Sequence, residues 1–232
     1  MVFGDLRACQ CPVTIGAKYN MLTQEQMQAN FERALAHMGQ FTEGQAAPQL
    51  AAKKIARALA DLGIPYVVVG GLAVAANGLE RTTEDVDLIL TKDGLAKFKD
   101  RWLGIGWVER FKGSKGLKDA EFALKVDILT PDEKPGDGKT CPFNFPDPST
   151  VGKPFDGIWG GMRMLDLRTL IELKCASWKT ADYRGRDMDD VIRLIKLNSL
   201  PRDFGKQLHQ YVQDTFDDLW RRAQNKDPYE DR

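Results

Sequence analysis

The chain has no long apolar run, no excess of charge of either sign and almost no histidine. No stretch of its 232 residues approaches the ~18 consecutive apolar residues that a transmembrane helix needs. The first residues lack the apolar core of a secretory signal. The 33 basic and 33 acidic side chains cancel, so no net charge draws the whole molecule towards nucleic acid or a membrane. We therefore expect a cytoplasmic protein with no membrane partner.

Cysteine and histidine are too few and too scattered to suggest a zinc centre. The four cysteines form no CxxC pair and stand at Cys9, Cys11, Cys141 and Cys175. Only His37 and His209 could join them as ligands. Reduced thiols are the simplest interpretation. With 43% hydrophobic and 28% charged residues, the composition is that of a folded soluble protein.

The chain divides into three parts. Residues 1–22 are irregular and are expected to form a loose N-terminal tail. Residues 23–160 are expected to form the core, and 161–232 a helical C-terminal part that completes the site. Within the core, residues 130–160 contain six of the eleven prolines, which excludes a helix there. A lid, a binding loop and partial disorder all remain open for this segment.

Hydrophobic periodicity predicts helices and strands in alternation. Thr23 and Gln26 have capping-box spacing at the start of the first helix. Helices are expected over 24–39, 48–62, 72–77, 95–102, 166–178, 187–197 and 203–223. Strands are expected over 66–69, 85–90, 107–111 and 122–128, with a hairpin-like loop at 113–119.

A glycine pair follows the first predicted strand. Gly70 and Gly71 stand between the apolar run 66–69 and a short helix. Glycine lets a phosphate approach the backbone closely, and the first turn of a helix favours an anion. Because most glycine turns are only turns, this feature by itself is a weak sign of phosphate binding.

Three aspartates are placed where they could converge. Asp85 and Asp87 alternate along a predicted strand, so their side chains project from the same face and could share a divalent cation. A solvated strand end is the alternative. Asp127 lies between apolar residues in another predicted strand and needs a partner. That partner is either a cation shared with the other two acids, or a salt bridge to Lys125 or another base.

Lys174 interrupts an apolar helical stripe. The stripe consists of Leu167, Leu170, Ile171 and Trp178. A lysine in its middle must extend to solvent or meet an anion. A triphosphate is a suitable anion, and a nearby acid such as Asp187 or Asp190 is the alternative.

The order of these blocks resembles the nucleotidyltransferase (polymerase-β-like) superfamily. Val69-Gly70-Gly71 is followed after thirteen residues by Asp85-Val86-Asp87-Leu88, and then by Asp127 on a later strand. The stretch from Asn77 to Asp87 is similar to the AbiEii-type toxin branch, as are Leu170–Ala176 and Arg184–Asp190. The resemblance covers about residues 66–197. It implies an α+β fold with a nucleotidyltransferase-type mixed β-sheet flanked by helices, and a helical C-terminal part.

The resemblance also implies roles for particular residues. Asp85 and Asp87 would hold two Mg²⁺ ions, and Asp127 would share the catalytic ion and help to deprotonate the attacking hydroxyl. The residues expected to bind the nucleoside triphosphate (NTP) are Gly70, Gly71, Arg81, Thr83 and Lys174.

The expected activity is transfer of a nucleoside monophosphate from an NTP to a hydroxyl, an EC 2.7.7 reaction. The acceptor is open. The resemblance implies tRNA or protein as the acceptor, in a toxin–antitoxin or phage-defence system. A cognate antitoxin would be the partner. An antibiotic-modifying enzyme and a non-catalytic nucleotide- or partner-binding module of the same fold are the alternatives. The basic stretch 92–118 could contact an RNA backbone, although a solvated surface is the default interpretation.

Overall fold

The computed structural model describes Thr23, Gln28, Ala29 and residues 38–225. The predicted tail over 1–22, Gln26, His37 and most of the helix expected over 24–39 lie outside the described residues. Residues 28–29 and 38–42 are helical. The described residues from 38 onwards belong to one unit, which the following paragraphs concern.

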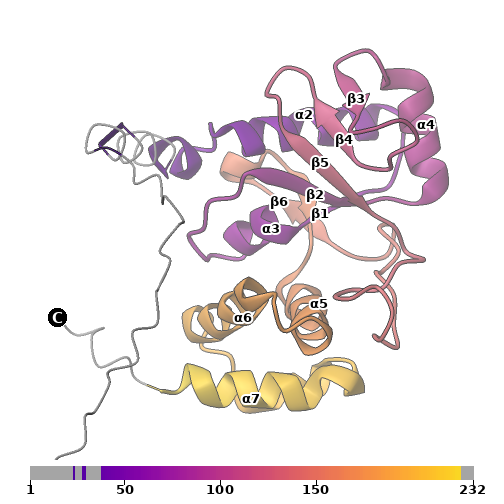
Figure 1. Ribbon diagram of the computed structural model, residues 1–232. Helices are drawn as coiled ribbons and strands as arrows, with labels where there is room; N and C mark the ends of the chain where they lie inside the picture. The colour runs from indigo at the N-terminus through magenta and orange to yellow at the C-terminus, as the bar shows by residue number, and fades with distance from the viewer. Residues whose placement is uncertain (1–22, 24–27, 30–37, 226–232) are drawn as a thin grey trace, which may run out of the picture. The chain divides into compact units, whose positions relative to one another are not determined.

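Within the described residues, seven strands form a mixed sheet in the order β3-β4-β5-β2-β1-β7-β6 (Figure 1). The strands are β1 (Val67–Val69), β2 (Asp85–Ile89), β3 (Trp107–Glu109), β4 (Leu117–Asp119), β5 (Lys125–Leu129), β6 (Lys153–Phe155) and β7 (Met162–Met164). β5 runs parallel to β2, and β1 runs antiparallel to β2 and parallel to β7. This topology confirms the expected mixed sheet of an α+β protein.

Helices cover both faces of the sheet. They are α2 (Ala47–Asp61), α3 (Gly70–Ala76), α4 (Lys92–Trp102), α5 (Leu167–Thr180), α6 (Gly185–Leu197) and α7 (Gln213–Ala223). α2 and α4 pack on one face, and α5, α6 and α7 lie together on the other (Figure 1). The expected helical C-terminal part is therefore present. No helix among the described residues is both long and apolar enough to cross a membrane.

The alternation of side chains along β2 decides which face carries the acids. Val86 and Leu88 are fully buried under α2 and α4. Ile89 points the other way, into the core formed with α5, α6 and α7. Because successive side chains alternate across a strand, Asp85 and Asp87 share the face of Ile89. The sheet thus presents its acids to the C-terminal helices.

The segment expected to be a hairpin-like loop at 113–119 ends in a strand. β4 pairs with β3 on one side and β5 on the other. Its Asp119 is completely buried, accepts hydrogen bonds from the backbone N–H of Glu121 and Phe122, and pairs with Lys54 at 2.8 Å. The predicted hairpin-like loop is therefore present over 113–116, between the antiparallel strands β3 and β4, and the prediction was wrong over 117–119, where buried Leu117 and the ion pair of Asp119 with distant α2 hold β4 in the sheet.

The strand expected over 122–128 is shorter and begins at Lys125. Ala123 adopts a φ of 55°, in the left-handed region, which ends the extended backbone before β5. Asp127 nevertheless keeps its predicted phase, since Val126 and Ile128 are buried on the opposite face. Phe111, the last residue of the strand expected over 107–111, lies beyond the end of β3 and is 71% exposed.

The sheet continues beyond the proline-rich segment. The prolines were expected to exclude a helix from 130–160, and the described segment contains no α-helix, but it holds β6 and a 3₁₀ turn at Gly157–Trp159. β6 forms a hairpin with β7. β7 then pairs with β1 near the centre of the sheet. The division between the core and the C-terminal part at residue 160 stays a prediction. β7 belongs to the sheet although it follows residue 160 in the chain.

The C-terminal helices match their predicted positions in part. The helix expected over 166–178 is present as α5, and the Asp166 side chain caps it by accepting a hydrogen bond from the backbone N–H of Thr169. The helix predicted over 203–223 is broken into two 3₁₀ turns and α7, with His209 between the turns. The Nδ1 atom of His209 accepts a hydrogen bond from the backbone N–H of Tyr211, which caps the second turn. Cys141 and Cys175 are buried free thiols.

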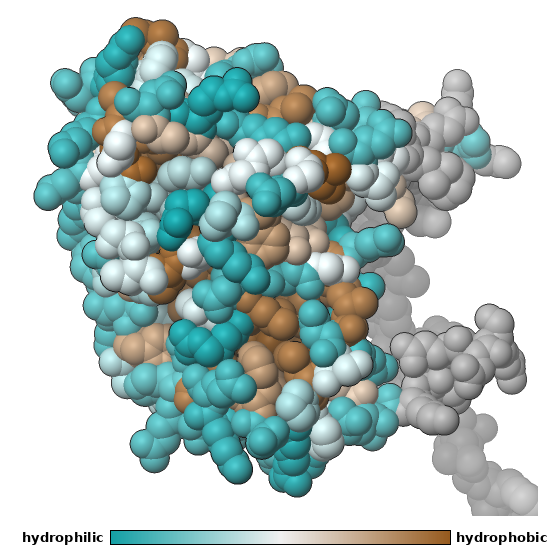
Figure 2. Space-filling model, turned by 180° about the vertical axis from the view of Figure 1, so that it is seen from behind, coloured by the Kyte–Doolittle hydropathy of each residue, from teal (hydrophilic) through white to brown (hydrophobic). Residues whose placement is uncertain are grey.

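On the side opposite to the view of Figure 1, hydrophilic groups predominate and apolar groups form smaller patches between them (Figure 2).

We expect Asp119→Ala to destabilise the protein by about 3 kcal/mol or more, because it removes one partner of a buried ion pair and leaves two backbone N–H groups without an acceptor. Lys118→Ala is the matched control on the same strand, since Lys118 is exposed. Its effect should stay within about 0.5 kcal/mol. Urea denaturation of both variants measures the difference, and equal effects would contradict the structural role of Asp119.

Candidate active site

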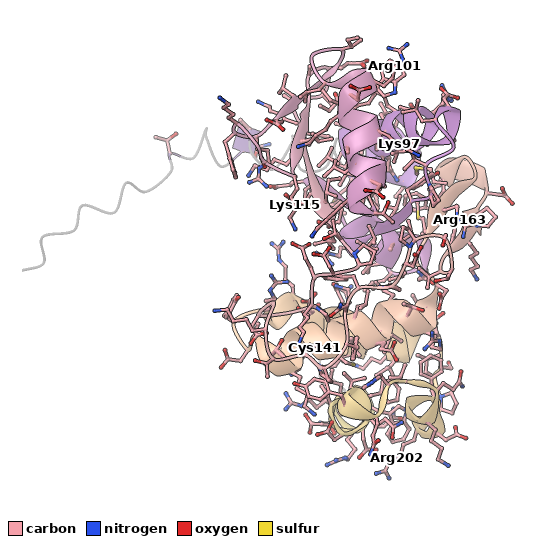
Figure 3. The ribbon with its side chains drawn as sticks, turned by 90° about the vertical axis from the view of Figure 1, so that its right-hand side faces the viewer. Lys97, Arg101, Lys115, Cys141, Arg163 and Arg202 are labelled. Carbon is pink, nitrogen blue, oxygen red and sulfur yellow. The ribbon has the colours of Figure 1, made fainter. Side chains whose placement is uncertain are left out.

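A cleft of about 1000 Å³ lies between the central strands of the sheet and helices α5 and α6. Its walls come from the end of β1, the segment 81–85, strands β2 and β5, α5 and the start of α6. Figure 3 shows Lys115 on the sheet side, towards α5 and α6. All of the site residues predicted from the sequence line this cleft: Gly70, Gly71, Arg81, Thr83, Asp85, Asp87, Asp127 and Lys174.

Three carboxylates meet at the floor of the cleft. Asp87 and Asp127 are register neighbours on the parallel strands β2 and β5, and Asp85 is two residues before Asp87. One carboxylate oxygen from each acid lies within 4.8 Å of the others. Among the described residues this is the only such group of three or more potential metal ligands. The predicted convergence of the three aspartates is therefore confirmed.

The donor set suits a divalent cation. Carboxylate oxygens are hard ligands, which Mg²⁺ prefers over nitrogen or sulfur. Oxygens of Asp85, Asp87 and Asp127 that lie within 4.8 Å of one another can converge on one cation after small rotations of the side chains. These residues fit the Mg²⁺ that the sequence resemblance implies.

Electrostatic repulsion within the group is visible in the pKa of Asp87. Burial, followed by the charges of Asp85 and Asp127, raises the pKa of Asp87 to about 7. The positive charges of Lys174 and Arg81 oppose this only in part. Protonation of Asp87 reduces the repulsion among the three carboxylates, and a bound cation would reduce it in the same way.

The two glycines make room for neighbouring side chains. Gly70 has a φ of +62°, and a Cβ atom there would lie 1.9 Å from Oδ2 of Asp87. A Cβ atom at Gly71 would lie 2.7 Å from Cβ of Thr83. Glycine is thus required at both positions to bring β1 close to the acids. A contact of these glycines with phosphate stays a prediction.

Thr83 orients one of the acids. Its side chain is buried, and its hydroxyl donates a 2.7 Å hydrogen bond to Oδ1 of Asp85. The geometry therefore gives Thr83 a positioning role towards Asp85. Its predicted contact with a nucleotide is untested.

Lys174 is buried and meets two acids. Its Nζ lies 2.8 Å from Oδ1 of Asp187 and 2.7 Å from Oδ2 of Asp190. Arg81 pairs with the same oxygen of Asp190, and the Ser177 hydroxyl donates to Asp187. Of the two alternatives for Lys174, the structure contains the pairing with Asp187 and Asp190. Two cations and two carboxylates form a neutral network that connects residue 81 to α5 and α6.

Asp127 has a basic partner that the sequence did not single out. Nη1 of Arg110 lies 2.5 Å from Oδ1 of Asp127. The base is therefore Arg110, not the neighbouring Lys125 that the sequence suggested. Arg110 follows β3 and reaches Asp127 only because β3, β4 and β5 lie side by side. No local sequence signal could have revealed this contact.

Two further arginines line the cleft without a carboxylate partner. Arg184 and Arg186 are exposed at the turn into α6. Neither forms an ion pair with any described residue, and Arg184 only approaches the Ser177 hydroxyl at 3.4 Å. These guanidinium groups are available to an anionic substrate.

The proline-rich segment forms one wall of the cleft. Residues 132–136 and Phe145 contribute to the lining. The backbone N–H of Asp137 donates to the Thr180 hydroxyl on α5 at 3.2 Å. A binding loop, one of the alternatives that the sequence left open for the segment 130–160, would line a cleft in this way.

No known family model matches the chain, and no curated protein matches it. Several solved structures resemble it, among them the following three. A presumed nucleotidyltransferase from Thermotoga maritima has 17% identity and a TM-score of 0.42, covering 64% of this chain and 91% of its own. The crystal structure of ANT(2'')-Ia in complex with adenylyl-2''-tobramycin has 13% identity and a TM-score of 0.47, covering 72% and 95%.

The solution structure of the antibiotic-resistance factor ANT(2'')-Ia has 14% identity and a TM-score of 0.44, covering 75% of this chain and 91% of its own. All three structures are thus of nucleotidyltransferases or a presumed one. At these identities and TM-scores, neither the substrate nor the site residues of those proteins can be assigned to this chain.

We expect the metal-free protein to lose stability as the pH rises from about 4 to about 7. Folded Asp87 keeps a proton that the unfolded chain releases near its ordinary pKa of 3.8. Over this window the folded state binds more protons, so the free energy of unfolding falls, on the order of a few kcal/mol from this group. Urea denaturation across the window measures the slope.

Asp87→Asn serves as the comparison, because asparagine cannot titrate and should flatten the slope. Added Mg²⁺ should also restore stability in the wild type at the upper end of the window, since the cation replaces the proton. Equal slopes for wild type and variant would mean that Asp87 is ionised throughout.

Proposed function

We propose that the protein is a Mg²⁺-dependent nucleotidyltransferase of the EC 2.7.7 type, which transfers a nucleoside monophosphate from an NTP to a hydroxyl. The observation that carries this proposal is the convergence of Asp85, Asp87 and Asp127 within 4.8 Å in a cleft of about 1000 Å³. The close approach of the Gly70-Gly71 turn to these acids supports it, as does the resemblance of the sequence blocks to the superfamily.

The three aspartates would hold the cation. When bound, Mg²⁺ neutralises charge on the phosphates and on the entering and leaving oxygens. Thr83 keeps the Asp85 carboxylate oriented through its hydrogen bond. The network of Lys174, Arg81 and the two α6 acids holds the C-terminal helices against the sheet, which keeps the cleft walls in place.

The cations of the cleft would bind the triphosphate. Arg184 and Arg186 are suited to this because no carboxylate among the described residues neutralises them. A guanidinium donates two parallel hydrogen bonds to phosphate oxygens. Arg81 and Lys174 are proposed to contribute as well, although each already meets acids.

Asp127 is the best-placed base. Its side chain is 37% exposed, so an acceptor can reach it. A carboxylate oxygen of Asp127 would accept the hydroxyl proton while the hydroxyl oxygen bonds to the α-phosphorus. The bond from the α-phosphorus to the bridging oxygen breaks, and pyrophosphate leaves with that electron pair.

The acceptor class is proposed from the similarity to the AbiEii-type branch. It would be tRNA or protein in a cytoplasmic toxin–antitoxin or phage-defence system, with a cognate antitoxin as partner. An antibiotic acceptor and a binding module without catalysis are the competing outcomes of the experiment.

Incubation with α-³²P-labelled NTPs, Mg²⁺ and separate pools of cellular RNA, protein and small molecules tests the proposal. We expect label to enter one pool with release of pyrophosphate. Asp87→Asn should lower this transfer by about 10²-fold or more, since it removes one carboxylate from the group that holds the cation.

The matched control is Asp93→Asn, which removes an exposed acid at the start of α4, away from the cleft lining. It should leave transfer unchanged. Transfer that is equally retained in both variants would refute catalysis by the aspartates. Nucleotide binding without transfer to any pool would favour the non-catalytic binding module.

A further inference from the structure

The contact between Arg110 and Asp127 joins a predicted metal ligand to a cation that the protein itself supplies. Nη1 of Arg110 lies 2.5 Å from Oδ1 of Asp127. Arg110 is 38% exposed and Asp127 is 37% exposed, so water reaches both partners. An ion pair at this exposure is weak and can be exchanged for another partner.

Gly116 leaves the space through which Arg110 reaches the acid. The backbone N–H of Arg110 donates to the carbonyl of Gly116, which holds the two residues side by side across the hairpin. A Cβ atom at Gly116 would lie 2.9 Å from Cδ of Arg110 and 3.5 Å from Oδ1 of Asp127. Because the φ of Gly116 lies outside the left-handed region, the backbone there does not require glycine. Instead, the absence of a side chain at Gly116 leaves room for the Arg110 side chain to reach Asp127.

The contact bears directly on cation binding. A guanidinium and a divalent cation on the same carboxylate repel each other. Arg110 also offsets part of the negative charge that the three acids bring together. Because the guanidinium already engages Oδ1 of Asp127, a cation that binds all three acids competes with Arg110 for the charge of this carboxylate.

We propose that Arg110 is a built-in counter-ion that competes with the divalent cation for Asp127. In the metal-free protein it keeps this carboxylate paired, and cation entry releases the guanidinium into the cleft. The inference rests on the proposed metal site and adds to it a residue that sets the affinity of that site.

Mn²⁺ binding in the absence of nucleotide tests the inference, measured by the electron paramagnetic resonance signal of free Mn²⁺. Arg110→Gln should bind Mn²⁺ about fivefold more tightly than the wild type, because the competitor is gone. Gly116→Ala keeps the positive charge and displaces the Arg110 side chain, so it should also tighten binding, by a smaller factor. Circular dichroism checks that both variants are folded.

Lys115→Gln is the matched control. It removes one positive charge from the lining of the same cleft, but Lys115 pairs with Glu133 and not with the aspartate group. Its effect on Mn²⁺ affinity should be less than about twofold, since partly exposed charges are screened.

Mn²⁺ affinity that is unchanged or weaker in Arg110→Gln, or equally tightened in Lys115→Gln, would overturn the proposal. If the wild type binds Mn²⁺ and Asp127→Asn weakens that binding, such a result refutes only the role of Arg110. If neither the wild type nor Arg110→Gln binds Mn²⁺, the metal site of the proposed function fails with it.

Discussion

The repulsion among three neighbouring carboxylates is the constraint that organises this molecule. Strands β2 and β5 bring Asp85, Asp87 and Asp127 together because they are parallel and adjacent, with their acids in the same phase. The raised pKa of Asp87 records the energetic cost of this arrangement. A fold that places the acids so close must supply positive charge from elsewhere, in the protein or from bound cations.

The protein supplies that charge from two directions. Lys174 and Arg81 lie near the acids on the side of α5 and α6, where Asp187 and Asp190 hold them in place. Arg110 approaches from the β3–β4 hairpin. The C-terminal helices are thus more than a cover for one face of the sheet. They carry the buried network that fixes two of the three cations at defined positions beside the cleft.

Period-two alternation was enough to predict the shared face of the aspartates, and a lysine in an apolar stripe was enough to predict that Lys174 meets an anion. Both are local signals, because the residues that decide them are only a few positions apart. Arg110 and β4 were missed for the opposite reason. β4 is short and polar, and its buried Asp119 depends on Lys54 from distant α2. Without β4 in the sheet, nothing in the sequence brings Arg110 near Asp127.

Charge balance in the cleft indicates how cations and substrate would depend on each other. The network of Arg81, Lys174 and the two α6 acids is neutral and contributes no net charge. The three aspartates bring three negative charges, of which Arg110 offsets one while it is paired. One divalent cation, which on our proposal displaces Arg110, leaves one negative charge on the group. A second would give the group one excess positive charge unless it arrived with the phosphates of a nucleotide, so any loading of a second ion would be coupled to substrate binding.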